Sequence, residues 1–477
     1  MTMRRMSPHA VTTWLLVAAL SLFAIAGTRI STSSIKTYEE SELLYNGDLA
    51  LKASTVSRWA AKNYNKPAEY ENMFFRLAYA FYKTAASNPN ASPDALRRIG
   101  VLTGSPEYFK KLTSSKILQG KTEVERKELE SEKAMWLAIY SKQVHQSEIK
   151  DFDRRIRTLG LGSATYYALS DLYEAAGQFN KAAAIDREAE RQAVATFWPI
   201  VLIGILMVIA LPFGFFVLIW FTMKWNRDEM YKKTNERPMA VSDQDSLYLS
   251  FNFYLIAMLA ISALGIMVIQ PKLSMMESNQ RATWDAVYML FKAASVGGLA
   301  TLVMSSLLKG KNFSLRDIGL SADNLWKNVL WGIVGYCAMA PLILTAERIW
   351  RDIQKFTPKG IDTPVNPITS MFASSNTFAV GASLVSAVLL APLFEEIFFR
   401  GALYQGMRVR QGFAVSALAS AAAFAIMHPF PASFLPVFIM GMGFAVMMEA
   451  RRSLVPAITA HAIHNGLSFL MLFLLSR

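Results

Sequence analysis

The chain from residue 196 onward consists largely of apolar stretches long enough to cross a lipid bilayer. About eight follow one another, near 198–223, 247–269, 284–308, 326–345, 376–408, 412–428, 434–449 and 454–475. A bilayer core about 30 Å thick requires roughly 20 apolar residues of α-helix. The sequence therefore predicts an all-α fold, with a polytopic transmembrane helical bundle of about eight spans over 196–477.

Composition agrees with a membrane protein that carries one soluble part. Of its 477 residues, 53% are hydrophobic and only 18% are charged, below the roughly 25% of an ordinary soluble domain. The single cysteine, Cys337, excludes a disulfide framework and a cysteine-based metal cluster within one chain. The net charge of +13 is typical of multispanning proteins with basic cytoplasmic loops, so no nucleic-acid partner is expected.

Residues 1–29 are predicted to form an N-terminal membrane anchor or a signal peptide. Arg4 and Arg5 precede an apolar run that ends near the small residues Ala24 and Ala26. This order is typical of a cleavable secretory signal, and equally of a retained anchor. The anchor is the favoured interpretation, and both deliver the next segment to the far side of the membrane.

Residues 30–195 have dense charge and helical periodicity, which predict a soluble, all-helical domain. Within it, 164–190 has the pattern of a helical hairpin, with Gly177 at the turn and large residues before it. Its characteristic positions are Leu169, Tyr173, Gly177, Phe179, Ala182 and Ala183. The hairpin resembles a tetratricopeptide repeat (TPR), but one clear copy leaves a generic helical hairpin open, since a stable array needs at least three.

The positions of the basic residues predict the orientation in the membrane. Several cations follow the first span after the soluble domain, namely Lys224, Arg227, Lys232, Lys233 and Arg237. Cytoplasmic loops are enriched in Lys and Arg, so residues 30–195 are predicted to be extracytoplasmic, in a plasma (inner) membrane protein. The basic loop 347–359 disagrees with this topology, and a re-entrant or interfacial helix there would resolve the conflict.

The stretch 393–406, LFEEIFFRGALYQG, places two carboxylates and an arginine inside an apolar span. Ionisable groups in a membrane interior are costly and by default indicate a functional site. If the helix continues past Arg400, Glu396 and Arg400 lie one turn apart and can neutralise each other. Glu395 projects about 100° away around the helix axis and is left free.

Three more polar residues fall on the last spans at a comparable depth. With about 1.5 Å of rise per residue, Glu395, His428 and Asn465 lie roughly 20–25 Å from the cytoplasmic ends of their helices, and His461 about 14 Å. His461 and Asn465 leave one face of the last helix, because they are four residues apart. Asp285 and Lys292, also in an apolar stretch, are expected to lie near an interface or to snorkel.

The three motifs Glu-Glu-x-x-x-Arg (395–400), Phe-x-x-x-His (424–428) and His-x-x-x-Asn (461–465) resemble those of the CPBP (ABI) family of intramembrane proteases. This family includes the type II CAAX prenyl endopeptidases, and the resemblance covers about the last 200 residues. It implies that Glu395 activates water, that His428 helps to orient and deprotonate it, and that His461 and Asn465 hold the oxyanion. Glu396 and Arg400 match structural members of the first motif, while His464 matches no part of the pattern.

The residue types are also compatible with a metal. Glu395, His428 and His461 could hold zinc with water in a fourth position. Asn465 is a poor zinc ligand and a good oxyanion donor, so the metal-free version is favoured and no cofactor is predicted, with zinc as the alternative.

The predicted function is therefore that of an intramembrane endopeptidase acting on membrane-embedded or membrane-proximal protein substrates, of which prenylated CAAX proteins are one class. The predicted partners are such a substrate, the lipid bilayer and a protein bound by residues 30–195. One alternative is a catalytically silent membrane scaffold or immunity protein of the same fold. Another is a transporter with a proton relay, which the lack of an inverted repeat disfavours.

Overall fold

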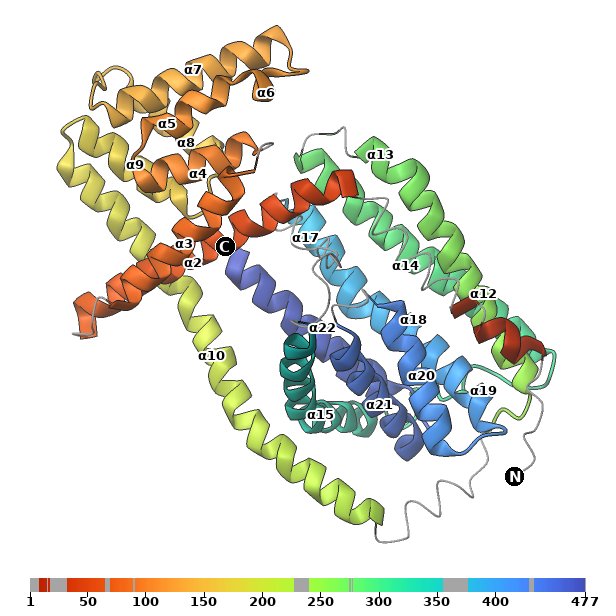
Figure 1. The fold of residues 1–477 in the computed structure, drawn as a ribbon. Helices are drawn as coiled ribbons and strands as arrows, with labels where there is room; N and C mark the ends of the chain where they lie inside the picture. Colours follow the sequence, from red (N-terminus) through yellow and green to blue (C-terminus); the bar gives the residue numbers. More distant parts are fainter. Residues whose placement is uncertain are drawn as a thin grey trace. The chain divides into compact units, whose positions relative to one another are not determined.

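The computed structural model describes residues 8–14, 16–17, 32–64, 69–88, 91–226, 240–273, 276, 278–354, 376–428 and 433–476. These residues form helices and the turns that join them, with no strand among them (Figure 1). The chain divides into two compact units, one made of 1–32 with 204–472 and the other mainly of Ser33–Ile203. The predicted all-α fold is confirmed over the described residues.

The unit around Ser33–Ile203 is a set of short and medium helices. They are α2 (Thr32–Tyr64), α3 (Glu69–Ala86), α4 (Pro93–Thr103), α5 (Pro106–Lys110), α6 (Ser115–Leu118), α7 (Glu123–Tyr140), α8 (Ile149–Thr158), α9 (Ala164–Ala175) and the first part of α10 (Phe179–Asn226). Local signals set several of their ends. Ser92 caps α4 by accepting a hydrogen bond from the Ala95 amide, and Thr122 and Glu125 form a reciprocal capping box at α7.

Aromatic side chains fill the core of this unit. The Phe109 ring stacks between Trp136, 4.9 Å away between centroids, and Tyr140, 5.2 Å away. All three side chains come from α5 and α7, two helices that pack directly on each other. Burial of large aromatic surfaces is the main source of stability in a core of this kind.

The hairpin predicted at 164–190 is present as two helices joined by a glycine turn. Helix α9 ends at Ala175, Gly177 has φ +71°, and α10 begins at Phe179. A positive φ is strained for residues with a Cβ, which explains the glycine. Leu169 and Ala182 are buried, but Phe179 is 68% exposed and so does not pack inside the hairpin. The assignment to the TPR class stays a prediction.

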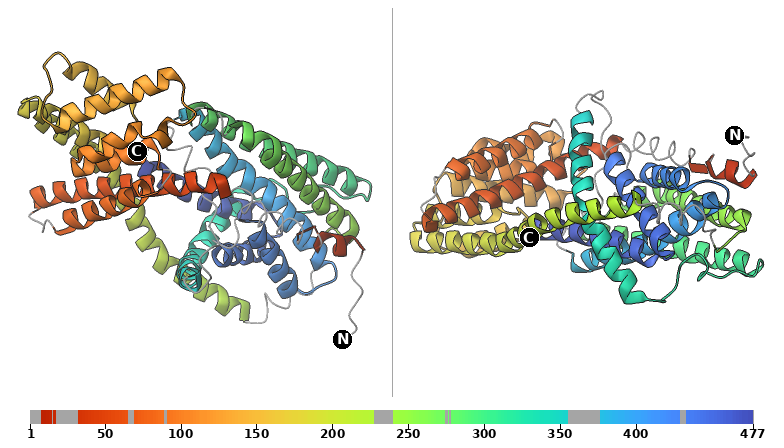
Figure 2. Two further views of the ribbon diagram at one scale, coloured as in Figure 1. Left: turned by 45° about the horizontal axis from the view of Figure 1, so that its top comes forward. Right: turned by 90° about the horizontal axis from the view of Figure 1, so that it is seen from below.

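The other unit is a bundle of long apolar helices. It contains the last part of α10, α12 (Gln244–Leu264), α13 (Gln270–Leu273), α14 (Ser278–Lys309), α15 (Leu325–Gln354), α17 (Thr377–Leu384), α18 (Ala391–Glu396), α19 (Gln405–Arg408), α20 (Phe413–Met427), α21 (Phe434–Arg451) and α22 (Val455–Ser476). Helices α12 and α14 lie side by side, as both views of Figure 2 show, and α21 packs on α15 and α20.

Six helical segments among the described residues are long and apolar enough to cross a membrane. They are Gln244–Leu273, Gln280–Lys309, Leu325–Trp350, Thr377–Arg408, Phe434–Arg451 and Val455–Leu474. Two shorter apolar helices, Ile209–Trp220 and Phe413–Met427, fall in the two remaining predicted stretches. The chain is therefore an integral membrane protein with a helical bundle.

The span Thr377–Arg408 runs through the double-glutamate motif without a break. It includes two π-helical turns, Val385–Leu390 and Ile397–Tyr404, on either side of α18. A π-helical turn widens the hydrogen-bond register by one residue, and such turns are frequent at functional sites. They rotate the side chains that follow relative to a regular α-helix.

Part of the predicted N-terminal segment 1–29 packs against α12. The Thr13 hydroxyl donates to Asn252 Oδ1 at 2.6 Å, and Asn252 Nδ2 donates to the His9 carbonyl at 3.2 Å. Residues 1–7, 15 and 18–29 lie outside the described residues, as do the predicted cytoplasmic cations from Arg227 to Arg237. In the basic loop 347–359, α15 continues to Gln354 and the rest lies outside the described part.

Candidate active site

Three of the predicted site residues come together from three helices of the bundle. Glu395 lies near the end of α18, His428 directly follows α20, and His461 lies on α22. Glu395 Oε2 is 3.8 Å from His428 Nε2 and 3.9 Å from His461 Nε2. This oxygen is buried and makes no hydrogen bond to a described residue. A water that lies beside such a pair of polar atoms can bridge them by a hydrogen bond to each.

His428 is oriented by the helix that precedes it. Its Nδ1 lies 2.7 Å from the Phe424 carbonyl oxygen. A carbonyl oxygen can only accept, so Nδ1 carries a proton and donates it. Nε2 is therefore the nitrogen that faces Glu395, with a lone pair in the neutral ring. This arrangement lets His428 accept a hydrogen bond from a water that also contacts Glu395.

His461 lies between two carboxylates. Its Nδ1 is 3.0 Å from Glu396 Oε1, and its Nε2 faces Glu395. The ring is almost completely buried and stacks on Phe444 with centroids 5.2 Å apart. Each ring nitrogen therefore has a carboxylate oxygen beside it. With a proton on Nε2, His461 can donate a hydrogen bond into the space beside Glu395.

Glu396 and Arg400 form a fully buried ion pair one helical turn apart. Their side chains are both 0% exposed, and Arg400 Nη1 is 3.2 Å from Glu396 Oε1. The guanidinium also donates to the Gly441 carbonyl at 3.2 Å and lies 4.3 Å from the Phe424 ring centroid. A buried pair of this kind holds its own helix against its neighbours, because either charge alone would be very costly there.

Asn465 bonds to the helix that carries Glu395. Its Nδ2 donates to the Ala387 carbonyl at 2.8 Å. In the π-helical register the Ala391 amide donates to Ser386, and the next nitrogen, that of Pro392, has no hydrogen. The Ala387 carbonyl therefore lacks its helical donor, and Asn465 supplies one. The same amide nitrogen carries a second N–H, which this bond leaves free.

His464 and Asp285 make their contacts with residues outside the predicted site. The His464 ring contacts Tyr336 edge-on, with centroids 6.1 Å apart, and so faces α15. Asp285 has local partners, since it accepts a hydrogen bond from Gln270 at 3.1 Å and pairs with Arg281 at 3.7 Å.

Lys292 lies close enough to Glu395 for their charges to interact. The sequence predicted that Lys292 lies near an interface or snorkels, and it gave no indication of an interaction with Glu395.

Glu395, His428 and His461, the residues predicted for zinc, lie slightly farther apart than the ligands of a bound zinc ion. Among the described residues, no group of three or more His, Cys, Asp or Glu side chains has the arrangement of a metal site. Ligand atoms about 2.0–2.1 Å from a tetrahedral zinc would lie about 3.4 Å apart, whereas Glu395 Oε2 is 3.8 and 3.9 Å from the two imidazole nitrogens.

One comparison with known proteins identifies a relationship. Residues 377–467 match the family model described as type II CAAX prenyl endopeptidase Rce1-like. The matched segment contains Glu395, Glu396, Arg400, His428, His461 and Asn465. It supports the CPBP resemblance for the helices that hold the site and does not extend to the unit around Ser33–Ile203. No curated protein and no solved structure matches the chain.

Proposed function

We propose that this protein is an intramembrane endopeptidase that hydrolyses peptide bonds of membrane-associated protein substrates. The observation that carries the proposal is the convergence of Glu395 Oε2 with Nε2 of His428 and of His461, at 3.8 and 3.9 Å, on apolar helices. A carboxylate and two imidazoles whose polar atoms lie within 4 Å of one another supply a general base and hydrogen-bond donors. The family match over 377–467 supports a protease.

In the proposed reaction, water lies between Glu395 and His428. Glu395 takes one proton while the water oxygen adds to the carbonyl carbon of the scissile bond. Negative charge then develops on the carbonyl oxygen, where His461 Nε2–H and the free N–H of Asn465 stabilise it. Glu395 passes its proton to the leaving nitrogen as the C–N bond breaks. A positioned acid-base group contributes about 10²–10⁴ in rate and an oxyanion donor about 10²–10³.

The surroundings support these roles. The Glu396–Arg400 pair adds no net charge, and Glu396 fixes the His461 ring through Nδ1. The aromatic rings of Phe424 and Phe444 exclude water from the back of the site. Fixed dipoles and charges act more strongly in such a medium than in water. No cofactor is required, and prenylated CAAX proteins are one class of substrate within the proposal.

The remaining parts of the proposal concern location and partners. The protein lies in the plasma (inner) membrane with residues 30–195 extracytoplasmic, and this helical region binds a protein partner or orients the substrate. Residues 1–29 serve as a retained anchor. The hydrogen bonds that Asn252 makes with Thr13 and His9 support the anchor, because they join this segment to the bundle.

The test compares cleavage of membrane proteins in cells that express the wild type, Glu395→Gln or Glu347→Gln. Both variants remove one carboxylate from the bundle, but Glu347 is exposed and lies outside the site. New protein termini in the membrane fraction are identified by quantitative mass spectrometry. We expect the same cleavage products with wild type and Glu347→Gln and none with Glu395→Gln. Identical products with all three forms would refute the proposed chemistry.

The same experiment separates the protease from the scaffold. A silent scaffold or immunity protein would give no cleavage products with any form, while a cellular phenotype of the wild type would persist with Glu395→Gln. Insertion of each variant is checked by its abundance in the membrane fraction.

A further inference from the structure

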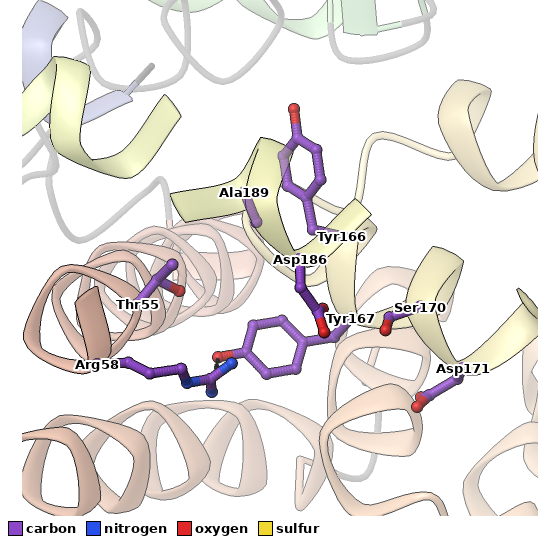
Figure 3. Close-up of a pocket in the computed structure, with 8 residues that line it drawn as sticks. All are labelled: Thr55, Arg58, Tyr166, Tyr167, Ser170, Asp171, Asp186 and Ala189. Atoms are coloured by element: carbon purple, nitrogen blue, oxygen red, sulfur yellow. Dashed lines mark hydrogen bonds between the residues drawn. The ribbon is translucent and has the colours of Figure 1, made fainter. Parts of the chain in front are cut away.

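The soluble helical unit contains a cavity of about 190 Å³ between α2, α9 and the beginning of α10. Its polar lining is made by Thr55, Arg58, Tyr166, Tyr167, Ser170, Asp171 and Asp186 (Figure 3). Figure 3 shows the Arg58 guanidinium at the hydroxyl end of Tyr167 and the Asp186 carboxylate near the other end of that side chain. The cavity lies within the unit of Ser33–Ile203 and is separate from the candidate active site.

The size of the cavity restricts its occupant. Sites for drug-sized molecules and cofactors measure about 300–1,000 Å³, so a cavity of about 190 Å³ is too small for most of them. It would hold roughly six waters at about 30 Å³ each. That is enough room for one long side chain of a peptide.

The charges around the cavity do not cancel. Arg58 is already neutralised, since its Nε is 2.6 Å from Glu71 Oε1 and its Nη2 donates to the Tyr167 hydroxyl at 3.2 Å. Asp171 accepts a hydrogen bond from the Tyr140 hydroxyl at 2.8 Å, which leaves its charge uncompensated. Asp186 makes no hydrogen bond or ion pair with another described residue. The free charge of the cavity is therefore negative.

The tyrosines complete a surface suited to a cation on an apolar stem. The Tyr167 ring already has a guanidinium near it, with Arg58 Cζ 5.7 Å from the ring centroid. Lysine and arginine cover apolar surface with their methylene stems and keep the charged end at a polar partner. Tyrosine rings attract such a charged end through their negative faces.

We propose that this cavity binds a basic side chain, lysine or arginine, of a peptide segment of a protein partner. The stem lies against Tyr166 and Tyr167, and the charged group reaches Asp186 with Asp171 behind it. Arg58 stays paired with Glu71 at the opposite end and does not compete for the two aspartates. This gives the partner of the soluble unit a defined chemistry, and it does not rest on the proposed cleavage reaction.

The test measures binding of blocked pentapeptides to the full chain in a neutral detergent by saturation-transfer NMR. The peptides share the sequence acetyl-Gly-Gly-Xaa-Gly-Gly-amide, with lysine, norleucine or glutamate as Xaa. We expect the lysine peptide to bind at least about tenfold more tightly than the norleucine peptide, because a hydrogen bond to a charged group contributes about that much. Added salt of about 0.5 M should weaken the lysine peptide alone.

Two variants locate the site. Asp186→Asn should weaken the lysine peptide by about tenfold, whereas Glu128→Gln, which removes an exposed acid on α7, should leave binding unchanged. Equal binding of the lysine and norleucine peptides to the wild type would overturn the proposal without any variant. So would preference for the glutamate peptide, unchanged binding to Asp186→Asn, or no binding up to about 10 mM. None of these results depends on whether the protein cleaves peptides.

Discussion

Glu396 and His461, 65 residues apart in the chain, are joined by a buried hydrogen bond of 3.0 Å between Oε1 and Nδ1. The bond connects α18 to α22 and turns the other ring nitrogen of His461 toward Glu395. The same Glu396 oxygen lies 3.2 Å from Arg400 Nη1. The Glu396 carboxylate thus bonds both to Arg400, one turn along its own helix, and to His461 on α22. The neighbouring Glu395 Oε2 makes no hydrogen bond to a described residue.

Replacing Glu396 should damage the fold more than replacing Glu395. Glu396→Ala leaves Arg400 as a buried charge without its partner, which typically costs about 3–5 kcal/mol. Glu395→Gln removes no ion pair at hydrogen-bond distance, so its stability should stay near that of the wild type. Thermal unfolding of both variants in detergent checks this. Equal midpoints for Glu396→Ala and the wild type would contradict the structural role of the pair.

Arg400→Lys tests the shape of the guanidinium rather than its charge. Lysine keeps the charge beside Glu396 but cannot also donate in a planar fork to the Gly441 carbonyl or lie flat on Phe424. We expect a loss of about 1–3 kcal/mol in the free energy of unfolding, since a buried hydrogen bond from a charged group is lost. The matched control is Arg348→Lys, at an exposed i,i+4 pair with Asp352, which should change stability very little. Similar losses in the two variants would count against this interpretation.

Several features of the bundle could be predicted because they are local. The spans follow from runs of apolar residues, and the Glu396–Arg400 pair follows from a spacing of four residues in one helix. The meeting of Glu395 with His428 and His461 follows from depth, since each side chain lies at a comparable distance from the end of its own helix. This distance can be counted along the sequence, because each helical residue adds about 1.5 Å of rise.

Contacts that depend on rotation and long-range packing could not be predicted. The acceptor of Asn465 is the Ala387 carbonyl, which loses its donor through a π-helical turn followed by Pro392. The proline was visible in the sequence, but the wider register was not. Likewise, nothing in the spacing of the motifs indicated that Gly441 would receive the guanidinium of Arg400. The residues that make up the site in the bundle could therefore be predicted better than the hydrogen bonds that they form.

Asn465→Ala distinguishes a catalytic role from a structural one. If the free N–H of Asn465 stabilises the oxyanion, kcat should fall by about 10²–10³ while KM changes little. The variant also leaves the Ala387 carbonyl unpaired, which should cost about 1–3 kcal/mol of stability. Kinetics are therefore measured at a temperature where the variant is fully folded, as shown by its unfolding curve. A drop in kcat no larger than the loss of folded protein would leave Asn465 with a structural role only.

The buried carboxyl of Asp171 should make the stability of the unit around Ser33–Ile203 depend on pH. Burial raises the pKa of its carboxyl from 3.8 to about 6, and the hydrogen bond from Tyr140 opposes this only in part. The folded unit therefore binds more protons than the unfolded chain between pH about 4 and 6, and its stability falls as the pH rises through that window. The loss is about 1–3 kcal/mol, because one unit of pKa difference corresponds to about 1.4 kcal/mol.

Asp171→Asn keeps an acceptor for Tyr140 and carries no charge, so it should be more stable than the wild type above pH 6 and equal to it near pH 4. Hydrogen exchange of the α9 amides, corrected for the intrinsic effect of pH, measures the difference, with Glu128→Gln as a control for net charge. A wild type whose protection rises between pH 4 and 7 relative to Asp171→Asn would reverse the sign and contradict the assignment.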